Sequence, residues 1–201
     1  MPLGDSITES IVGLNSYRFW LYNMLINAGL NIDFVGNRSG VFGGFPSNRN
    51  FDTDHQAVTG IRADEVIPQL ASIAGANDPD IVLLFLGTND ILEFQDVNST
   101  LNDLSRIIDI LREQNPLVKV LIAQITPTSR PQAQSIAILS QRIAQLANQK
   151  NQRISPVVAV DQFNGFSVAL DTYDGLHPNT SGDIKIAGNF FNSIADLLFH
   201  Q

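Results

Sequence analysis

The 201-residue sequence predicts an α/β fold, a three-layer sandwich whose central five-stranded parallel sheet has flavodoxin-like strand order. Short apolar segments rich in Val and Ile alternate with longer segments that carry apolar residues at helical spacing. This alternation is typical of a parallel sheet with helices on both faces. Glycine and proline are spread along the chain without a linker or repeat, so we expect residues 1–201 to form a single domain.

The predicted strands are short and apolar. The first is the stub Met1–Leu3, which we expect to be the end of a strand at the middle of the sheet. The other four are Asn31–Gly36, Asp80–Leu86, Lys119–Ile125 and Val157–Val160. Near-continuous apolar runs of this length are typical of strands that are buried on both faces, as in a parallel sheet.

Two helices are predicted in the first half of the chain. One covers Tyr17–Ala28 and begins after a cap at Asn15 or Ser16. The other ends at Ala74, with Pro68 placed in its first turn, where proline is tolerated because the N–H that it lacks would have no helical partner.

Three more helices are predicted from apolar stripes in the second half. The stripes consist of Leu101, Leu104, Ile107, Ile108 and Leu111; of Ile136, Leu139, Ile143, Leu146 and Ala147; and of Ile184, Ala187, Phe191, Ile194 and Leu198. The first is expected to begin at Asn98 or Ser99. The last is expected to begin at Thr180–Asp183, a segment that resembles a capping box.

Charge and composition exclude several classes of function. Twelve basic and twenty acidic side chains give a formal charge of −8, which disfavours nucleic-acid binding. The sequence has no cysteine, and therefore no disulfide, thiolate metal site or cysteine nucleophile. Ile81–Leu86 is the longest apolar run, far short of the roughly 20 residues of a membrane span. No signal peptide is visible, which leaves a secreted or a cytoplasmic location open, and we expect a monomer or a weak homo-oligomer.

Polar residues follow three of the predicted strands. Gly4-Asp5-Ser6 follows the first, Gly87-Thr88-Asn89-Asp90 the third, and Asp174-Gly175-Leu176-His177-Pro178 the fifth across a loop. In open α/β sheets ligands bind outside the carboxyl ends of the strands. We therefore expect these three segments to meet at one edge of the sheet.

Together the three segments contain the groups that acyl transfer requires. Ser6 is the candidate nucleophile, and a serine needs an imidazole to take its proton and a carboxylate to orient that imidazole. His177 and Asp174 are three positions apart, close enough to interact within one turn. The backbone N–H of Ser6, an N–H near Gly60 and the Asn89 amide could converge on an oxyanion, although Asn89 could also cap the next helix.

Other polar residues have structural interpretations. Asp5 and Asp90 are expected to make structural hydrogen bonds, and Arg62 to be solvated at the start of a helix. His55 lies in a long loop, where it fixes the loop or borders a substrate site. His200 is the next-to-last residue and is expected to fray.

The long loop Asn37–Thr59 is expected to be functional, because structureless loops of this length are uncommon in compact domains. Its aromatic residues Phe42, Phe45 and Phe51 could form one wall of the site. Its Asn, Asp and Arg side chains suit sugar hydroxyls better than an acyl chain.

The order and spacing of these segments resemble a known family. Gly4-Asp5-Ser6-Ile7-Thr8-Glu9, Gly60, Gly87-Thr88-Asn89-Asp90 and Asp174-Gly175-Leu176-His177-Pro178 resemble the four sequence blocks of the SGNH hydrolases, also called GDSL esterases/lipases. The resemblance covers nearly the whole chain and implies a single SGNH hydrolase domain. It implies Ser6 as nucleophile, His177 as base and Asp174 as its orienter, with the N–H groups of Ser6 and Gly60 and the Asn89 side chain as oxyanion donors. It also implies that no metal or organic cofactor is needed.

A finer resemblance is to the acetylxylan-esterase-like members of carbohydrate esterase family three. It is carried by the start Met1–Ser6, by Ser16-Tyr17-Arg18, by Ile32–Gly36 and by the pair Asp54-His55. It implies a serine esterase that removes acetyl groups from a sugar or polysaccharide through an acyl-enzyme on Ser6. The chain departs from that branch at Gln56–Thr59, and Ser10 stands where many relatives have glycine.

Three other functions are compatible with the sequence. A lysophospholipase or thioesterase of the same superfamily would need an apolar groove lined by Phe and Leu. Acetyl transfer between sugars would use the same triad but exclude water. A non-catalytic, flavodoxin-like binding protein would share the fold, but would have no reason to carry Ser6, Asn89, Asp174 and His177 together.

Overall fold

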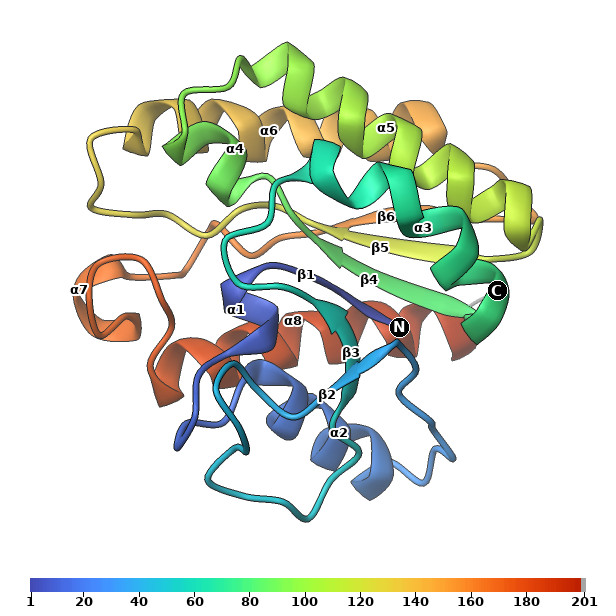
Figure 1. Ribbon diagram of the computed structural model, residues 1–201, viewed down its shortest axis with the longest axis horizontal. Helices are drawn as coiled ribbons and strands as arrows, with labels where there is room; N and C mark the ends of the chain where they lie inside the picture. Colours follow the sequence, from blue (N-terminus) through green and yellow to red (C-terminus); the bar gives the residue numbers. More distant parts are fainter. Residues whose placement is uncertain (200–201) are drawn as a thin grey trace.

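The computed structural model describes residues 1–199, and in it a mostly parallel sheet lies between two layers of helices (Figure 1). The strands are β1 (Pro2–Gly4), β2 (Arg38–Ser39), β3 (Asp54–Ala57), β4 (Ile81–Phe85), β5 (Lys119–Ala123) and β6 (Val157–Val160). Their order is β2-β3-β1-β4-β5-β6, and only β2 and β3 pair antiparallel among them. The predicted class and the flavodoxin-like order of the five parallel strands are confirmed. The predicted number of strands is wrong, because the sheet has a sixth strand, the short edge strand β2.

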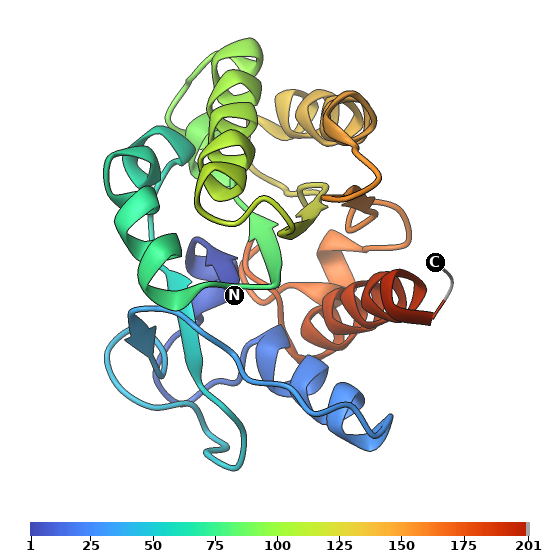
Figure 2. The same cartoon turned by 90° about the vertical axis from the view of Figure 1, so that its right-hand side faces the viewer.

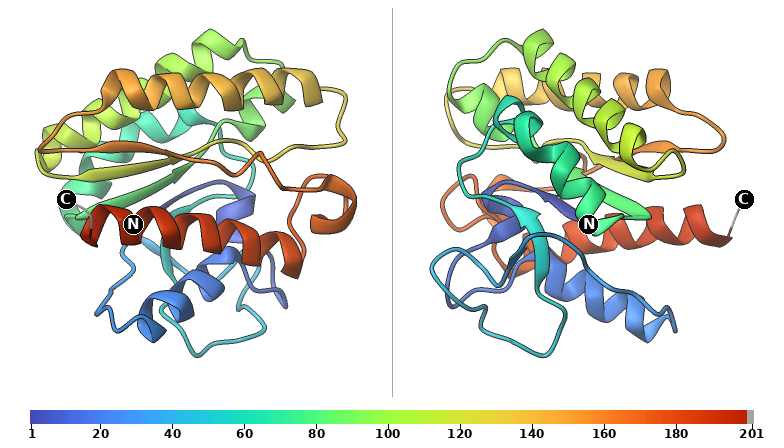
Figure 3. Two further views of the ribbon diagram at one scale, coloured as in Figure 1. Left: turned by 180° about the vertical axis from the view of Figure 1, so that it is seen from behind. Right: turned by 45° about the vertical axis from the view of Figure 1, so that its right-hand side comes forward.

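Long helices cover the two faces of the sheet. The helices α3 (Ala63–Asn77), α5 (Val97–Gln114) and α6 (Ala133–Lys150) lie on one face, and α2 (Tyr17–Asn27) and α8 (Thr180–Phe199) lie on the other (Figures 1 and 2). The short helices α1 (Ser6–Glu9), α4 (Thr88–Leu92) and α7 (Val168–Asp171) gather at the end of the sheet to which the strands point (Figure 3). This end is where the sequence predicts the site.

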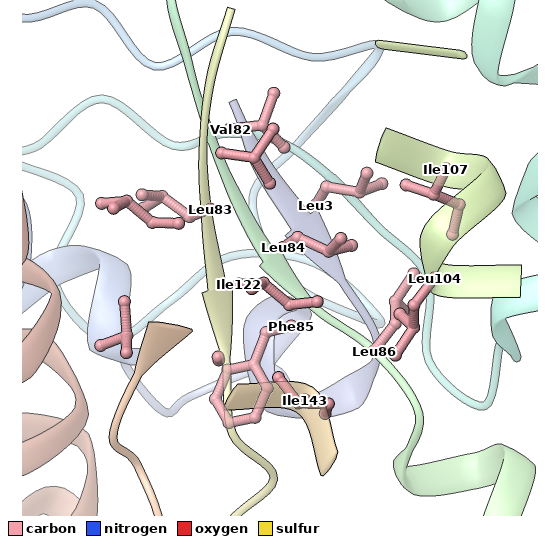
Figure 4. Packing of buried hydrophobic residues seen from close by; sticks show 14 of the residues in the cluster. Leu3, Val82, Leu83, Leu84, Phe85, Leu86, Leu104, Ile107, Ile122 and Ile143 are labelled. Carbon is pink, nitrogen blue, oxygen red and sulfur yellow. The ribbon is translucent and has the colours of Figure 1, made fainter. Parts of the chain in front are cut away.

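The core consists of the predicted strands and the predicted helical stripes. Leu3 of β1 and Leu84 of β4 are neighbours across the sheet, and both are almost completely buried. Leu104 of α5 and Ile143 of α6 pack against the same layer (Figure 4). The central strand β1 is short but buried along its whole length, because β3 and β4 flank it on both sides. Within residues 1–199, each helix is too short or too polar to cross a bilayer.

The predicted strand Asn31–Gly36 is wrong, because β3 occupies that place beside β1. In this segment the Phe34 N–H donates to a side chain and not to a neighbouring strand: Asp52 Oδ2 accepts from it at 2.6 Å. The strand found in the structure, Asp54–Ala57, has a sequence with low β-propensity, and its buried residues are His55 and Ala57. The loop Asn37–Thr59 therefore contains two strands and is not structureless.

Several helix starts differ from the prediction. Ser16 caps α2 as expected. Asp96 caps α5 in place of Asn98 or Ser99, and the Asn179 side chain accepts from the first N–H groups of α8 in place of a capping box at Thr180–Asp183. Pro68 lies inside α3 and not in its first turn, because the helix begins at Ala63.

A buried arginine joins the long loop to α1, at the end of the sheet where the sequence predicts the site. The guanidinium of Arg18 donates to the backbone oxygens of Thr8 and Glu9 in α1, and to those of Gly40 and Thr53 in the loop. Burial lowers the pKa of Arg18 to about 10, which leaves it charged at neutral pH. The loop is thus held at a fixed distance from α1. The prediction for His200 falls outside the described residues.

Candidate active site

Ser6 is the first residue of α1, directly after the turn that ends β1. At Gly4 a Cβ would lie 2.2 Å from Thr8 Oγ1, so only glycine allows the chain to turn this tightly. Asp5 caps the helix, with Oδ1 accepting from the Ile7 N–H at 2.9 Å. Ser10 ends the helix at φ 64°, a conformation that favours glycine, and its N–H donates to the Ser6 carbonyl.

Three of the predicted residues form a continuous hydrogen-bonded chain. Ser6 Oγ lies 3.1 Å from His177 Nε2, and His177 Nδ1 lies 2.8 Å from Asp174 Oδ2. The other carboxylate oxygen of Asp174 accepts from the backbone N–H groups of Leu176 and His177. Partial burial acts to raise the pKa of Asp174, but the hydrogen bonds from the imidazole and the two N–H groups outweigh it and hold the pKa below its usual value.

The loop after β5 holds the Asp174–His177 turn. Gly175 has φ 83°, and a Cβ there would lie 2.0 Å from Ser129 Oγ. Its carbonyl accepts from the hydroxyl of Thr128 at 2.8 Å and from the N–H of Ser129 at 2.9 Å. Arg130 places a guanidinium nitrogen 3.5 Å from Asp174 Oδ2. Sequence reasoning missed these contacts, because nothing in the segment Thr128–Arg130 marks it as a partner of a turn so distant in the chain.

The segment that carries Gly60 is anchored from two sides. The Glu9 carboxylate accepts from the Thr59 N–H at 2.6 Å, and the Asp90 carboxylate accepts from the Ala63 N–H at 3.2 Å. Asn89 donates from Nδ2 to the Ile61 carbonyl at 3.0 Å and not to its own helix, whose N-cap is Gly87. The capping interpretation of Asn89 is therefore wrong.

The carboxyl groups of Asp5 and Asp90 make the structural hydrogen bonds predicted for them. Burial is the largest effect on both: it raises the pKa of Asp5 to about 7 and that of Asp90 to about 6, against the backbone N–H groups that favour the charged forms. Asp183 of α8 is another buried carboxyl, which the sequence placed only in the predicted start of a helix. Burial raises its pKa well above the usual value, despite a hydrogen bond from the Tyr17 backbone and the charge of Arg18.

A pocket of about 180 Å³ opens above Ser6. Its lining comprises Ser6, Ile7, Ser10, Ile11, Phe42, Thr59, Tyr173, His177, Pro178 and Asp183. A larger cavity of about 640 Å³ lies at the opposite, amino-terminal end of the strands, around Met1 and the segment Leu30–Val35. That cavity contains neither a serine nor a histidine, so the smaller pocket is the candidate active site.

The remaining predicted residues divide between the rim and the interior. Phe42 lines the pocket, whereas Phe51 is buried against Phe19 and does not. His55 is buried and fixes the loop, with Nδ1 accepting from the Ala57 N–H, and burial lowers its pKa to about 3. Arg62 is the N-cap residue of α3 and pairs with acidic side chains, among them Glu93 at 2.6 Å.

Comparison with known proteins agrees with this geometry. Residues 3–183 match the GDSL-like Lipase/Acylhydrolase family. A carbohydrate esterase family 3 structure from Talaromyces cellulolyticus is 30% identical, with a TM-score of 0.88 over 100% of this chain and 98% of that chain. An acetyl esterase mutant crystallised with an acetate ion is also 30% identical, with a TM-score of 0.87 over 98% of this chain and 96% of that one.

A curated relative, the multidomain esterase of Ruminococcus flavefaciens, is 27% identical over 98% of this chain. This chain spans only 28% and 62% of the lengths of the two curated relatives that it matches. The match to the family covers most of this chain, and the alignment with the Talaromyces protein covers all of it. The chain therefore belongs to the GDSL-like lipase/acylhydrolase family of carboxylic ester hydrolases, and within it to carbohydrate esterase family 3.

Proposed function

We propose that the protein is a serine esterase that removes acetyl groups from carbohydrate through an acyl-enzyme on Ser6. The observation that carries the proposal is the chain from Ser6 Oγ to His177 Nε2 at 3.1 Å and from His177 Nδ1 to Asp174 at 2.8 Å, beside a small pocket. The family match over residues 3–183 supports the further proposal that residues 1–201 form a single catalytic domain.

In the first half-reaction Ser6 Oγ attacks the ester carbonyl carbon while His177 Nε2 takes the hydroxyl proton. Asp174 holds the proton on Nδ1 and stabilises the imidazolium that forms. The negative charge on the carbonyl oxygen is met by the N–H groups of Ser6 and Gly60 and by Asn89. One Nδ2 hydrogen of Asn89 is bonded to Ile61, and the second is left for the oxyanion.

Collapse of the tetrahedral intermediate breaks the bond to the alcohol, which leaves with the proton from His177. A water molecule then attacks the acetyl-serine and gives its proton to the same nitrogen. The second intermediate releases acetate and returns the proton to Ser6 Oγ. Each group is used twice, so one imidazole serves as base and acid in both half-reactions.

The size of the pocket supports a short acyl group. At about 180 Å³ it is below the roughly 300–1,000 Å³ of sites that bury drug-sized ligands. A lysophospholipase or thioesterase would need a longer apolar groove. The relatives named as carbohydrate esterase and acetyl esterase support the same choice of acyl group and alcohol.

Ser6 is expected to react stoichiometrically with an alkyl fluorophosphonate, because His177 makes its hydroxyl nucleophilic. Intact-mass measurement should show one adduct, and peptide mapping should place it on the peptide that contains Ser6. Ser99, at the start of α5, is the matched serine and should stay unlabelled. A protein that hydrolyses esters while Ser6 remains unmodified would require another nucleophile.

Initial rates on p-nitrophenyl esters are expected to be highest for acetate. We expect kcat/KM to fall about tenfold or more at butyrate and further at octanoate, because a pocket of fixed size excludes added methylenes. Ile7 is buried and lines the pocket, so Ile7→Ala should raise the butyrate-to-acetate ratio. A preference for octanoate would favour the lysophospholipase alternative.

A further inference from the structure

Two exposed aromatic side chains stand at the mouth of the Ser6 pocket. Phe42 is 51% exposed and Tyr173 is 55% exposed, and both line the pocket together with Ser6 and His177. Phe42 belongs to the long loop after α2, and Tyr173 to the segment between α7 and α8 (Figure 1). Large aromatic rings left exposed to water around a cavity are typical of binding sites.

Both rings are carried on backbone that is already fixed. The Phe42 N–H donates to the Ser10 carbonyl at 3.1 Å, and its carbonyl accepts from the Val12 N–H at 2.9 Å. The Tyr173 N–H donates to the His177 carbonyl at 3.1 Å, and the Tyr173 ring lies nearly parallel to the His177 imidazole, with 5.8 Å between centroids and 14° between planes. A ligand that binds these rings therefore loses little energy in ordering them.

The rings lie where the alcohol part of an ester held at Ser6 can contact them. Phe42 and Tyr173 line the same pocket as Ser6, so a sugar whose acetyl group is at Ser6 lies beside both rings. A pyranose ring has an apolar face of C–H groups that packs on an aromatic face, and hydroxyls at its edge. The hydroxyls of Ser10, Thr59 and Tyr173 line the same pocket and can meet those edges.

The neighbouring Phe45 differs from Phe42 in its contacts and in its position relative to the pocket. The Arg49 guanidinium lies 4.0 Å from the centroid of the Phe45 ring. Phe45 is also outside the pocket lining. Of the two exposed aromatics on this stretch of loop, Phe42 is therefore the one that lines the pocket.

We infer that Phe42 and Tyr173 form a subsite that holds the sugar ring of an acetylated pyranoside while Ser6 attacks its acetyl group. The inference rests on the proposed function and adds to it the residues that select the alcohol. Such contacts bind the ground state and the transition state alike, so their loss should appear mainly in KM.

The test compares an acetylated methyl β-xylopyranoside with methyl acetate, whose alcohol is too small to reach either ring. For Phe42→Ala and Tyr173→Ala we expect the ratio of the two kcat/KM values, xyloside over methyl acetate, to fall about tenfold. Tyr173→Phe keeps the ring and should recover most of the ratio. Phe199→Ala removes an aromatic that is 63% exposed at the far end of α8, and should leave both rates at the wild-type values.

A second measurement separates this inference from the proposed function. The variant Ser6→Ala cannot turn over, and adding Phe42→Ala to it should raise the Kd of the acetylated xyloside about tenfold in a calorimetric titration. An unchanged Kd together with an unchanged ratio would overturn the subsite. Wild-type protein that binds the xyloside in a Phe42-dependent way but hydrolyses neither ester would overturn the proposed function and leave the subsite standing.

Discussion

Asp174→Asn is expected to lower kcat about 10⁴-fold while the protein remains folded. The aspartate accepts the Nδ1 proton of His177, which leaves Nε2 free to accept a proton from Ser6. An asparagine can present its NH₂ group to Nδ1, which moves the ring proton to Nε2 and removes the base. The carbonyl oxygen of asparagine can still accept from the N–H groups of Leu176 and His177, so the turn keeps its conformation.

Asp161→Asn is the matched control for this loss. Asp161 Oδ1 accepts from the N–H groups two and three residues ahead, at 3.0 and 2.9 Å, in the same local pattern as Asp174. It has no contact with His177 and should retain full kcat. Single-turnover and steady-state rates, with melting temperatures for both variants, provide the comparison. Turnover near the wild-type rate in Asp174→Asn would exclude Asp174 as the orienting residue.

Asn89→Ala is expected to lower kcat about 10²–10³-fold with little change in KM, which corresponds to about 3–4 kcal/mol of transition-state stabilisation. We expect Asn89 to act only by stabilising the negative charge that develops on the carbonyl oxygen in the transition state. Asn89→Asp should be at least as poor, because a carboxylate repels both that oxygen and the Ile61 carbonyl to which Asn89 now donates. Both variants should still accept the fluorophosphonate, more slowly.

Asn164→Ala is the control for removing an asparagine side chain from the surface. Its amide donates to Asp161 in a loop after β6, so its loss should leave kcat unchanged. Melting temperatures report whether either substitution disturbs the fold. A stable and fully active Asn89→Asp protein would remove Asn89 from the oxyanion site.

The sequence identifies the groups that the structure brings together in the candidate site, because each lies in a short motif that follows a strand. Ser6 and the Asp174–His177 turn could be identified without knowing how the chain folds between them. Strand β3 could not be identified in this way, since Asp54–Ala57 is polar by composition and only the fold shows that His55 and Ala57 are buried. Tyr173 was missed for a similar reason: its place over His177 depends on the conformation of the turn and not on any pattern in the sequence.

The position of β1 has a consequence for how the enzyme acquires activity during folding. Its neighbours across the sheet are Gln56 and Ala57 of β3 on one side and the residues of β4 on the other, so none is supplied by neighbouring sequence. Ser6 then has to meet His177 across a separation of 171 positions in the chain. Loop-closure entropy makes such non-local pairings late and slow. Recovered esterase activity therefore reports completion of the whole sheet, and a partly folded chain, however helical, has no active site.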